Sequence, residues 1–123
     1  MVDLTLSGCN WVLRVNLWGV VHGLAIYLKG LLARNEGHVV VTASVAGHTS
    51  FPGIGPYNAS KHAVSAIAET LHNELVVAGS DVGITSLCPG FVATGIFDSG
   101  RNRPEHLLDA LAELPSAIGR AHV

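Results

Sequence analysis

Residues 38–88 open with the run HVVVTAS (residues 38–44) and close with the run VGITSLC (residues 82–88). Both runs are short, continuous and rich in β-branched residues, which is typical of strands buried on both faces of a parallel sheet. Glycine and proline crowd residues 45–56 and predict a loop. Residues 57–78 have the apolar periodicity of a helix. Strand, loop, helix and strand in this order predict a parallel βαβ crossover.

A second helical pattern precedes this unit, over residues 9–34. We expect Ser7 to cap its start and residues 35–37 to end it. Its apolar positions recur at three- and four-residue steps: Trp11, Val12, Val15, Val20, Leu24, Leu28 and Leu31. In the helix of the crossover, Val64, Ile67, Ala68, Leu71 and Leu75 form the apolar stripe, and Glu69, His72, Asn73 and Glu74 lie off it.

After the second strand we expect a loop to Pro104 and a short helix near residues 105–113. The predicted fold class is therefore α/β: part of a Rossmann-type, doubly wound parallel sheet, in which a long helix precedes a βαβ unit. We interpret residues 1–123 as one partial domain.

Composition limits the function classes. The 123 residues suffice for one domain. They are 49% hydrophobic but only 13% charged, whereas about a quarter of the residues of an ordinary domain are charged. This apolar excess predicts surfaces that are covered by partners. The longest apolar stretch, residues 17–32, contains His22, Lys29 and three glycines, so we expect no membrane span. Scattered basic residues and a net charge of −2 disfavour nucleic acid as a partner.

The cysteines and histidines suggest no metal centre. Cys9 and Cys88 lie far apart, and the seven histidines have no zinc-ligand spacing. No basic residue precedes Arg14, so a secretory signal is not expected. Two lone thiols without such a signal predict a reducing, cytoplasmic location.

Tyr57 and Lys61 form a YxxxK motif where the crossover helix begins. A four-residue spacing places both side chains on one helix face. A phenol loses its proton only near pH 10, and a neighbouring ammonium favours the phenolate, so such a pair suits proton exchange near neutral pH. The alternative is a surface tyrosine and a solvated lysine, because so short a motif often occurs by chance.

Two further polar residues are candidates. Ser44 ends the first strand, at the sheet edge where open α/β folds bind ligands, and its hydroxyl could bond a substrate carbonyl and steady an oxyanion. Alternatively it bonds only its own loop. Asn16 lies inside the first helix, where asparagine is unfavourable. A helix distortion that holds a water would explain it, and boundary polarity is the alternative.

The segment PGFVAT (residues 89–94) follows the second strand. Pro89 ends the pairing, Gly90 lets the backbone approach a ligand closely, and Thr94 offers a hydroxyl beyond the sheet edge. An ordinary strand-exit turn is the alternative.

Four blocks occur in order: VNLWGVVHG, GHVVVTASVAG, YNASKHAV and LCPGFVATGI. Over about residues 8–104 they resemble the second half of the short-chain dehydrogenase/reductase pattern. The resemblance implies an NAD- or NADP-dependent oxidoreductase that passes a hydride between the nicotinamide and a small carbonyl or alcohol substrate. It also implies a homo-oligomer that pairs through the two long helices.

The same resemblance implies a role for each candidate residue. Tyr57 matches the catalytic acid/base, and Lys61 matches the residue that tunes it and holds the nicotinamide ribose. Ser44 matches the residue that orients the substrate, and Asn16 the residue that supports a proton-relay water. The segment beside the nicotinamide is matched by Pro89, Gly90, Val92 and Thr94, with the backbone of Val92 meeting the carboxamide.

The departures from the family pattern concern the cofactor. The family's TGxxxGxG loop and Asn-Asn-Ala-Gly stretch are not in the sequence, so the pyrophosphate site and the residue that selects NAD or NADP are expected in a missing N-terminal half. Gly53 and Gly55 give only a GxG without a third glycine. The rival hypothesis is a non-catalytic half-domain that serves as an interaction fragment. A hydrolase is disfavoured, because Ser44 lies in TASVA rather than GxSxG.

Overall fold

The computed structural model describes residues 5–102 and 104–105. A long helical segment comes first: α1 (Leu6–Leu13), the π-helix Arg14–Trp18 and α2 (Gly19–Arg34). The strand β1 (His38–Thr42), the 3-10 turn Val45–Gly47, the helix α3 (Gly55–Val77) and the strand β2 (Gly83–Leu87) follow. The 3-10 helix Gly95–Asn102 comes last among the described elements.

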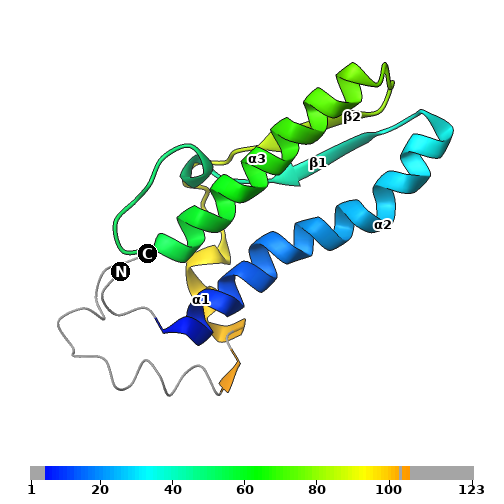
Figure 1. Ribbon diagram of the computed structural model, residues 1–123. Helices are drawn as coiled ribbons and strands as arrows, with labels where there is room; N and C mark the ends of the chain where they lie inside the picture. Colours follow the sequence, from blue (N-terminus) through cyan, green and yellow to red (C-terminus); the bar gives the residue numbers. More distant parts are fainter. Residues whose placement is uncertain (1–4, 103, 106–123) are drawn as a thin grey trace.

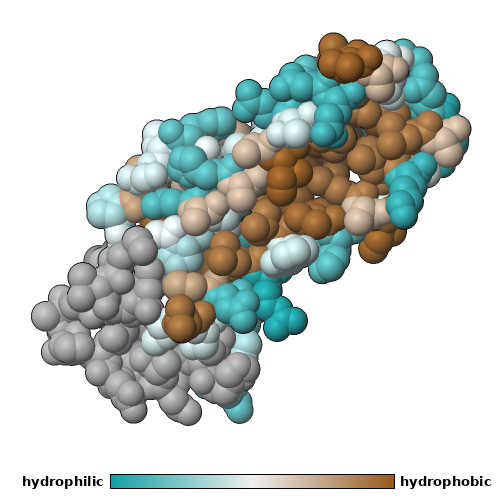
Figure 2. Space-filling model, viewed as in Figure 1, coloured by the Kyte–Doolittle hydropathy of each residue, from teal (hydrophilic) through white to brown (hydrophobic). Residues whose placement is uncertain are grey.

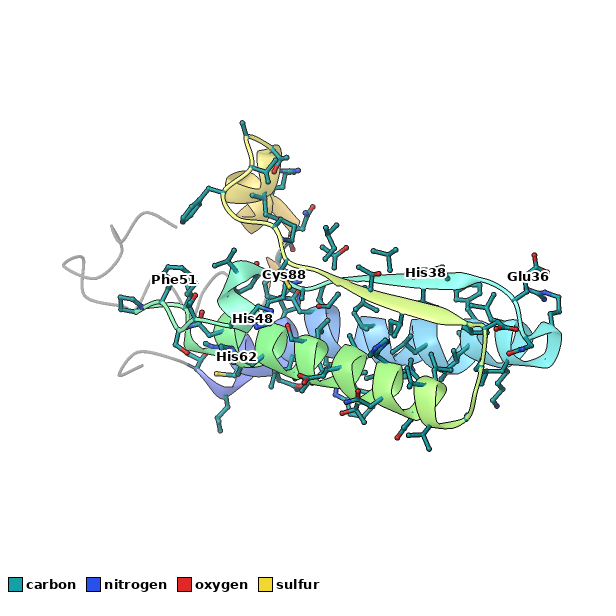
Figure 3. The ribbon with its side chains drawn as sticks, turned by 90° about the horizontal axis from the view of Figure 1, so that it is seen from above. Glu36, His38, His48, Phe51, His62 and Cys88 are labelled. Carbon is teal, nitrogen blue, oxygen red and sulfur yellow. The ribbon has the colours of Figure 1, made fainter. Side chains whose placement is uncertain are left out.

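The two strands pair in parallel, with His38 opposite Gly83 and Thr42 opposite Leu87. The predicted crossover and the α/β fold class are therefore confirmed. Figure 1 shows α2 and α3 side by side, and Figure 3, turned by 90°, shows both strands in a second layer on one side of the two helices. The core lies between these layers and includes Val41, Val64, Ala68, Leu75 and Val82.

The expectation that the strands are buried on both faces is wrong for this chain. Alternate residues of β1 differ in exposure: Val41 is 5% exposed, whereas its neighbour Val40 is 59% exposed. Leu87 on β2 is 50% exposed. Because α2 and α3 cover the same side, the other face of the sheet has no layer against it within the described residues.

Three local expectations also need correction. Thr5, not Ser7, caps the first helix, since its hydroxyl accepts a hydrogen bond from the Gly8 N–H at 3.1 Å. Residues 95–102 form a 3-10 helix instead of a loop. Residues 45–47 of the predicted 45–56 loop form a 3-10 turn. The helix expected near residues 105–113 lies, apart from its first residue, outside the described residues.

Asn35 ends α2 and fixes the chain that leads into β2. It adopts a left-handed conformation (φ 48°), which asparagine tolerates better than most residues. Its side-chain oxygen accepts from the Ser80 hydroxyl at 2.9 Å and from the Asp81 N–H at 3.0 Å, and its amide donates to the Asp81 carboxylate at 2.9 Å. These bonds join the starts of the two strands, so the strands end together at the opposite edge.

The segment Leu6–Arg34 is a continuous helical stretch of 29 residues that is long and apolar enough to cross a membrane. A core helix of a soluble protein passes the same test, so this is weak evidence for a membrane span. Along one side of the segment, apolar residues pack against the core: Leu17, Val20, Leu24, Leu28 and Leu31. Figure 1 shows the segment running beside α3 for most of its length.

Candidate active site

Tyr57 and Lys61 lie in the first turns of α3. Pro56 occupies one of the first helical positions, where its missing N–H costs nothing. The Lys61 Nζ lies 5.7 Å from the centre of the Tyr57 ring and donates a hydrogen bond to the carbonyl O of Thr42 at 2.9 Å. Since Thr42 ends β1, this bond holds the ammonium at the carboxyl edge of the sheet.

Burial of the Lys61 side chain lowers its pKa below the usual 10.5, and the charge of an ionised Cys88 acts in the opposite direction. Both Lys61 and Tyr57 are half-buried. Lys61 is therefore partly desolvated and bonded to the sheet, rather than free in solvent.

Ser44 lies two residues beyond β1. Its Oγ accepts a hydrogen bond from the Ala46 N–H at 3.1 Å and so caps the 3-10 turn Val45–Gly47. The turn packs tightly on α3, because a Cβ on Gly47 would lie 2.8 Å from the carbonyl O of Lys61. Ser44 therefore does bond its own loop, as the alternative expected. Its hydroxyl only accepts in this bond, so its O–H can still donate to a substrate.

Asn16 lies in the π-helix Arg14–Trp18, so the expected distortion of the helix is confirmed. Its side-chain N–H donates to the Ser60 Oγ at 3.2 Å, and the Ser60 hydroxyl donates to the carbonyl O of Tyr57 at 2.7 Å. Ser60 is fully buried. These two bonds connect the distorted helix to the turn of α3 that carries Tyr57.

The segment after β2 also lies at the carboxyl edge of the sheet. The Val45 N–H donates to the carbonyl O of Pro89 at 3.0 Å, which fixes the segment beside the turn that follows Ser44. Gly90, Val92 and Thr94 are exposed. The Thr94 Oγ1 accepts from the Ile96 N–H at 3.4 Å, at the start of the last 3-10 helix. The proposed nicotinamide segment is therefore open to solvent in this chain.

Residues 2–105 match the family model described as short chain dehydrogenase. The chain belongs to the short-chain dehydrogenase family. A crystal structure of a short-chain dehydrogenase/reductase from Burkholderia phymatum, in complex with NAD, is 42% identical with a TM-score of 0.81. The similarity covers 100% of this chain and 48% of that one.

Curated relatives agree with this membership. An uncharacterized oxidoreductase of Staphylococcus saprophyticus is 38% identical over 116 residues, which are 91% of this chain and 47% of the relative. The farnesol dehydrogenase of Aedes aegypti is 38% identical over 110 residues, 87% of this chain and 45% of the relative. The chain thus spans about half the length of the family members that it matches.

Sequence reasoning missed two features of this short-chain dehydrogenase site. One is Ser60 of the YNASK block, whose hydroxyl links Asn16 to the carbonyl O of Tyr57. The other is the pair of Cys88, expected to be a lone thiol, and His48, whose Nε2 lies 3.3 Å from the Cys88 Sγ. Neither pair shows a local signal, because each joins residues at least forty positions apart.

Proposed function

We propose that this chain supplies the catalytic half of an NAD- or NADP-dependent oxidoreductase that transfers a hydride between the nicotinamide and a carbonyl or alcohol carbon. The observation that carries the proposal is the Lys61 ammonium, bonded to the end of β1 beside the Tyr57 ring. Catalytic groups of open α/β sheets belong at this edge. The NAD complex of the Burkholderia relative supports a nicotinamide cofactor.

In this proposal Tyr57 gives its proton to, or takes it from, the substrate oxygen. Ser44 donates its O–H to the same oxygen and steadies negative charge there. Lys61 keeps a positive charge beside the tyrosine. Asn16 positions the start of α3 through Ser60 and supports the relay water that resupplies the proton. Proton transfer by a positioned side chain is worth about 10²–10⁴-fold in rate.

The residues present suit one end of the cofactor. An ammonium has three N–H donors, and Thr42 takes one, so Lys61 has donors for ribose hydroxyls. Gly90, Val92 and Thr94 are exposed at the same sheet edge and suit the nicotinamide end, with the Val92 backbone at the carboxamide. When bound, the nicotinamide accepts or supplies the hydride.

We propose that the protein acts on small molecules in the cytoplasm. The free thiols of Cys9 and Cys88 agree with such a reducing compartment. We further infer that a second copy packs against α2 and α3. An apolar groove runs between these helices (Figure 2), and Leu24, Leu28, Leu32, Ile67 and Leu71 line it. Surface of this kind usually marks an interface.

The test is a joined protein in which the N-terminal half of the Burkholderia relative precedes this chain. We expect it to oxidise or reduce members of a panel of alcohols and carbonyl compounds, farnesol included, with NAD or NADP. Lys61→Ala should weaken both nucleotide binding and turnover, whereas Arg34→Ala at the exposed end of α2 should change neither. A folded joined protein that binds nucleotide but turns over no substrate would favour the rival hypothesis of an interaction fragment.

A further inference from the structure

Cys88 and His48 meet beside the candidate active site, although neither belongs to the proposed catalytic set. Cys88 directly follows β2, and His48 directly follows the turn Val45–Gly47. The Nε2 of His48 lies 3.3 Å from the Cys88 Sγ (Figure 3). His48 is exposed, and Cys88 is half-buried at the margin of the core.

The charged side chain of Lys61 also lies near this sulfur. An ionised Cys88 raises the pKa of Lys61 against the lowering caused by burial, so the ammonium and the sulfur lie within electrostatic reach. An imidazole beside a thiol can act as the general base that takes its proton, which makes the sulfur a nucleophile. The other cysteine provides a contrast: within the described residues, the Cys9 side chain on α1 makes no hydrogen bond.

We propose that Cys88 and His48 form a thiol-addition site for soft electrophiles of the conjugated-carbonyl class. The Cys88 sulfur forms a bond to the β-carbon, and the electron pair of the C=C bond moves to the α-carbon and its carbonyl. His48 takes the thiol proton and returns it to the α-carbon. The net change is addition of S–H across C=C, so the step needs no oxidant and has no leaving group.

An adduct on Cys88 would lie beside the proposed cofactor segment; this step rests on the proposed function. Cys88 immediately precedes Pro89 and Gly90, and the carbonyl of Pro89 is bonded to Val45 beside Ser44. A group attached to the Cys88 sulfur therefore occupies space next to the segment assigned to the nicotinamide. Addition at Cys88 should exclude the cofactor.

The test uses N-ethylmaleimide, a conjugated carbonyl compound, on the full chain. Peptide mass spectrometry gives separate labelling rates for Cys88 and Cys9, in buffer and in urea. We expect the ratio of the Cys88 rate to the Cys9 rate to be on the order of ten-fold higher in buffer than in urea, since only the folded chain holds His48 at the sulfur.

His48→Gln should slow labelling of Cys88 by about ten-fold or more and leave Cys9 unchanged. His62→Gln is the matched control, because the His62 ring bonds the backbone of its own helix at Asn58 instead of a thiol. Equal Cys88 rates in the His48→Gln variant and the unchanged chain would overturn the proposal, as would equal rate ratios in buffer and urea. These measurements use neither nucleotide nor turnover, so their failure would leave the proposed function standing.

Discussion

Lys61 is the residue whose charge the proposed chemistry most requires. Burial lowers its pKa below 10.5, so the folded protein gives up this proton at a lower pH than the unfolded chain does. The contribution of Lys61 to the free energy of unfolding therefore rises with pH, from the lowered pKa up to about 10.5. Below the lowered pKa, the buried charge destabilises the folded chain. A charged Lys61 at neutral pH thus lowers the stability of the fold, while it supplies the positive charge that the proposed site requires.

The first prediction concerns that charge. In the joined protein, nucleotide affinity should fall as the pH rises through a value below 10.5, because neutral Lys61 loses its charge-assisted bonds to the ribose. Lys61→Arg, which stays charged, should bind more weakly at neutral pH but lose little further affinity on the alkaline side. Fluorescence titration with NADH at several pH values measures this, and a flat affinity up to pH 10.5 in the unchanged protein would refute it.

The second prediction separates two buried serines of α3. Ser60 accepts from Asn16 and donates to Tyr57, whereas the Ser65 hydroxyl is buried without a partner among the described residues. Ser60→Ala leaves the Asn16 amide unpaired and should lower the free energy of unfolding of the joined protein by about 1–3 kcal/mol. Ser65→Ala should be neutral or stabilising. Urea denaturation distinguishes them, and equal effects would show that the Asn16–Ser60 bond contributes little.

At the scale of the element, local patterns predicted most of the fold. Unbroken β-branched runs predicted β1 and β2, and the apolar periodicity of α3 identified Val64, Ala68 and Leu75, all of which are buried. Helix ends were less certain, because Thr5 and Ser7 are both suitable caps and only the geometry selects Thr5.

The candidate site divides in the same way. Ser44 and the segment from Pro89 to Thr94 were predictable because both follow strands, and parallel strands end at one edge. The bond from Lys61 to Thr42 and the contact between His48 and Cys88 were not, since they join separate elements. The roles of Tyr57 and Lys61 in catalysis stay predictions.

The third prediction concerns the glycine-rich element that the sequence does not contain. Pyrophosphate binding in this fold uses backbone N–H groups of a helix that follows the first strand through a glycine-rich loop. In this chain α3 follows β1 through the turn Val45–Gly47 and a loop of different pattern. The chain alone should therefore bind NADH weakly or not at all, as followed by nucleotide fluorescence. Saturable micromolar binding would contradict this.

At the scale of the whole molecule, apolar surface is exposed on two sides: the open face of the sheet at Val40 and Leu87, and the groove between α2 and α3. At roughly 25 cal/mol per Å², several hundred Å² of such surface correspond to on the order of 10 kcal/mol, which is comparable with the stability of a domain. We therefore expect the chain to bury that surface against other chains.

The fourth prediction is that the chain alone forms dimers or larger assemblies instead of a well-packed monomer. Light scattering after size exclusion measures the mass, and near-ultraviolet circular dichroism reports packing. Leu32→Lys, in the groove, should shift the chain towards smaller species, whereas Leu6→Lys at a 90% exposed position outside the groove should not. A monodisperse species of 12.8 kDa with a cooperative thermal transition would contradict the prediction.

The most direct test of the proposed catalysis is the substitution Tyr57→Phe in the joined protein. It removes only the hydroxyl that we assign to the substrate oxygen, so turnover should fall by about 10²-fold or more while NADH affinity changes by less than about two-fold. Glu69→Gln, at an exposed position on α3 outside both the site and the groove, is the control and should leave both quantities unchanged. If the Tyr57→Phe protein retained most of its turnover, Tyr57 would not be the acid/base and the account of this site would be wrong.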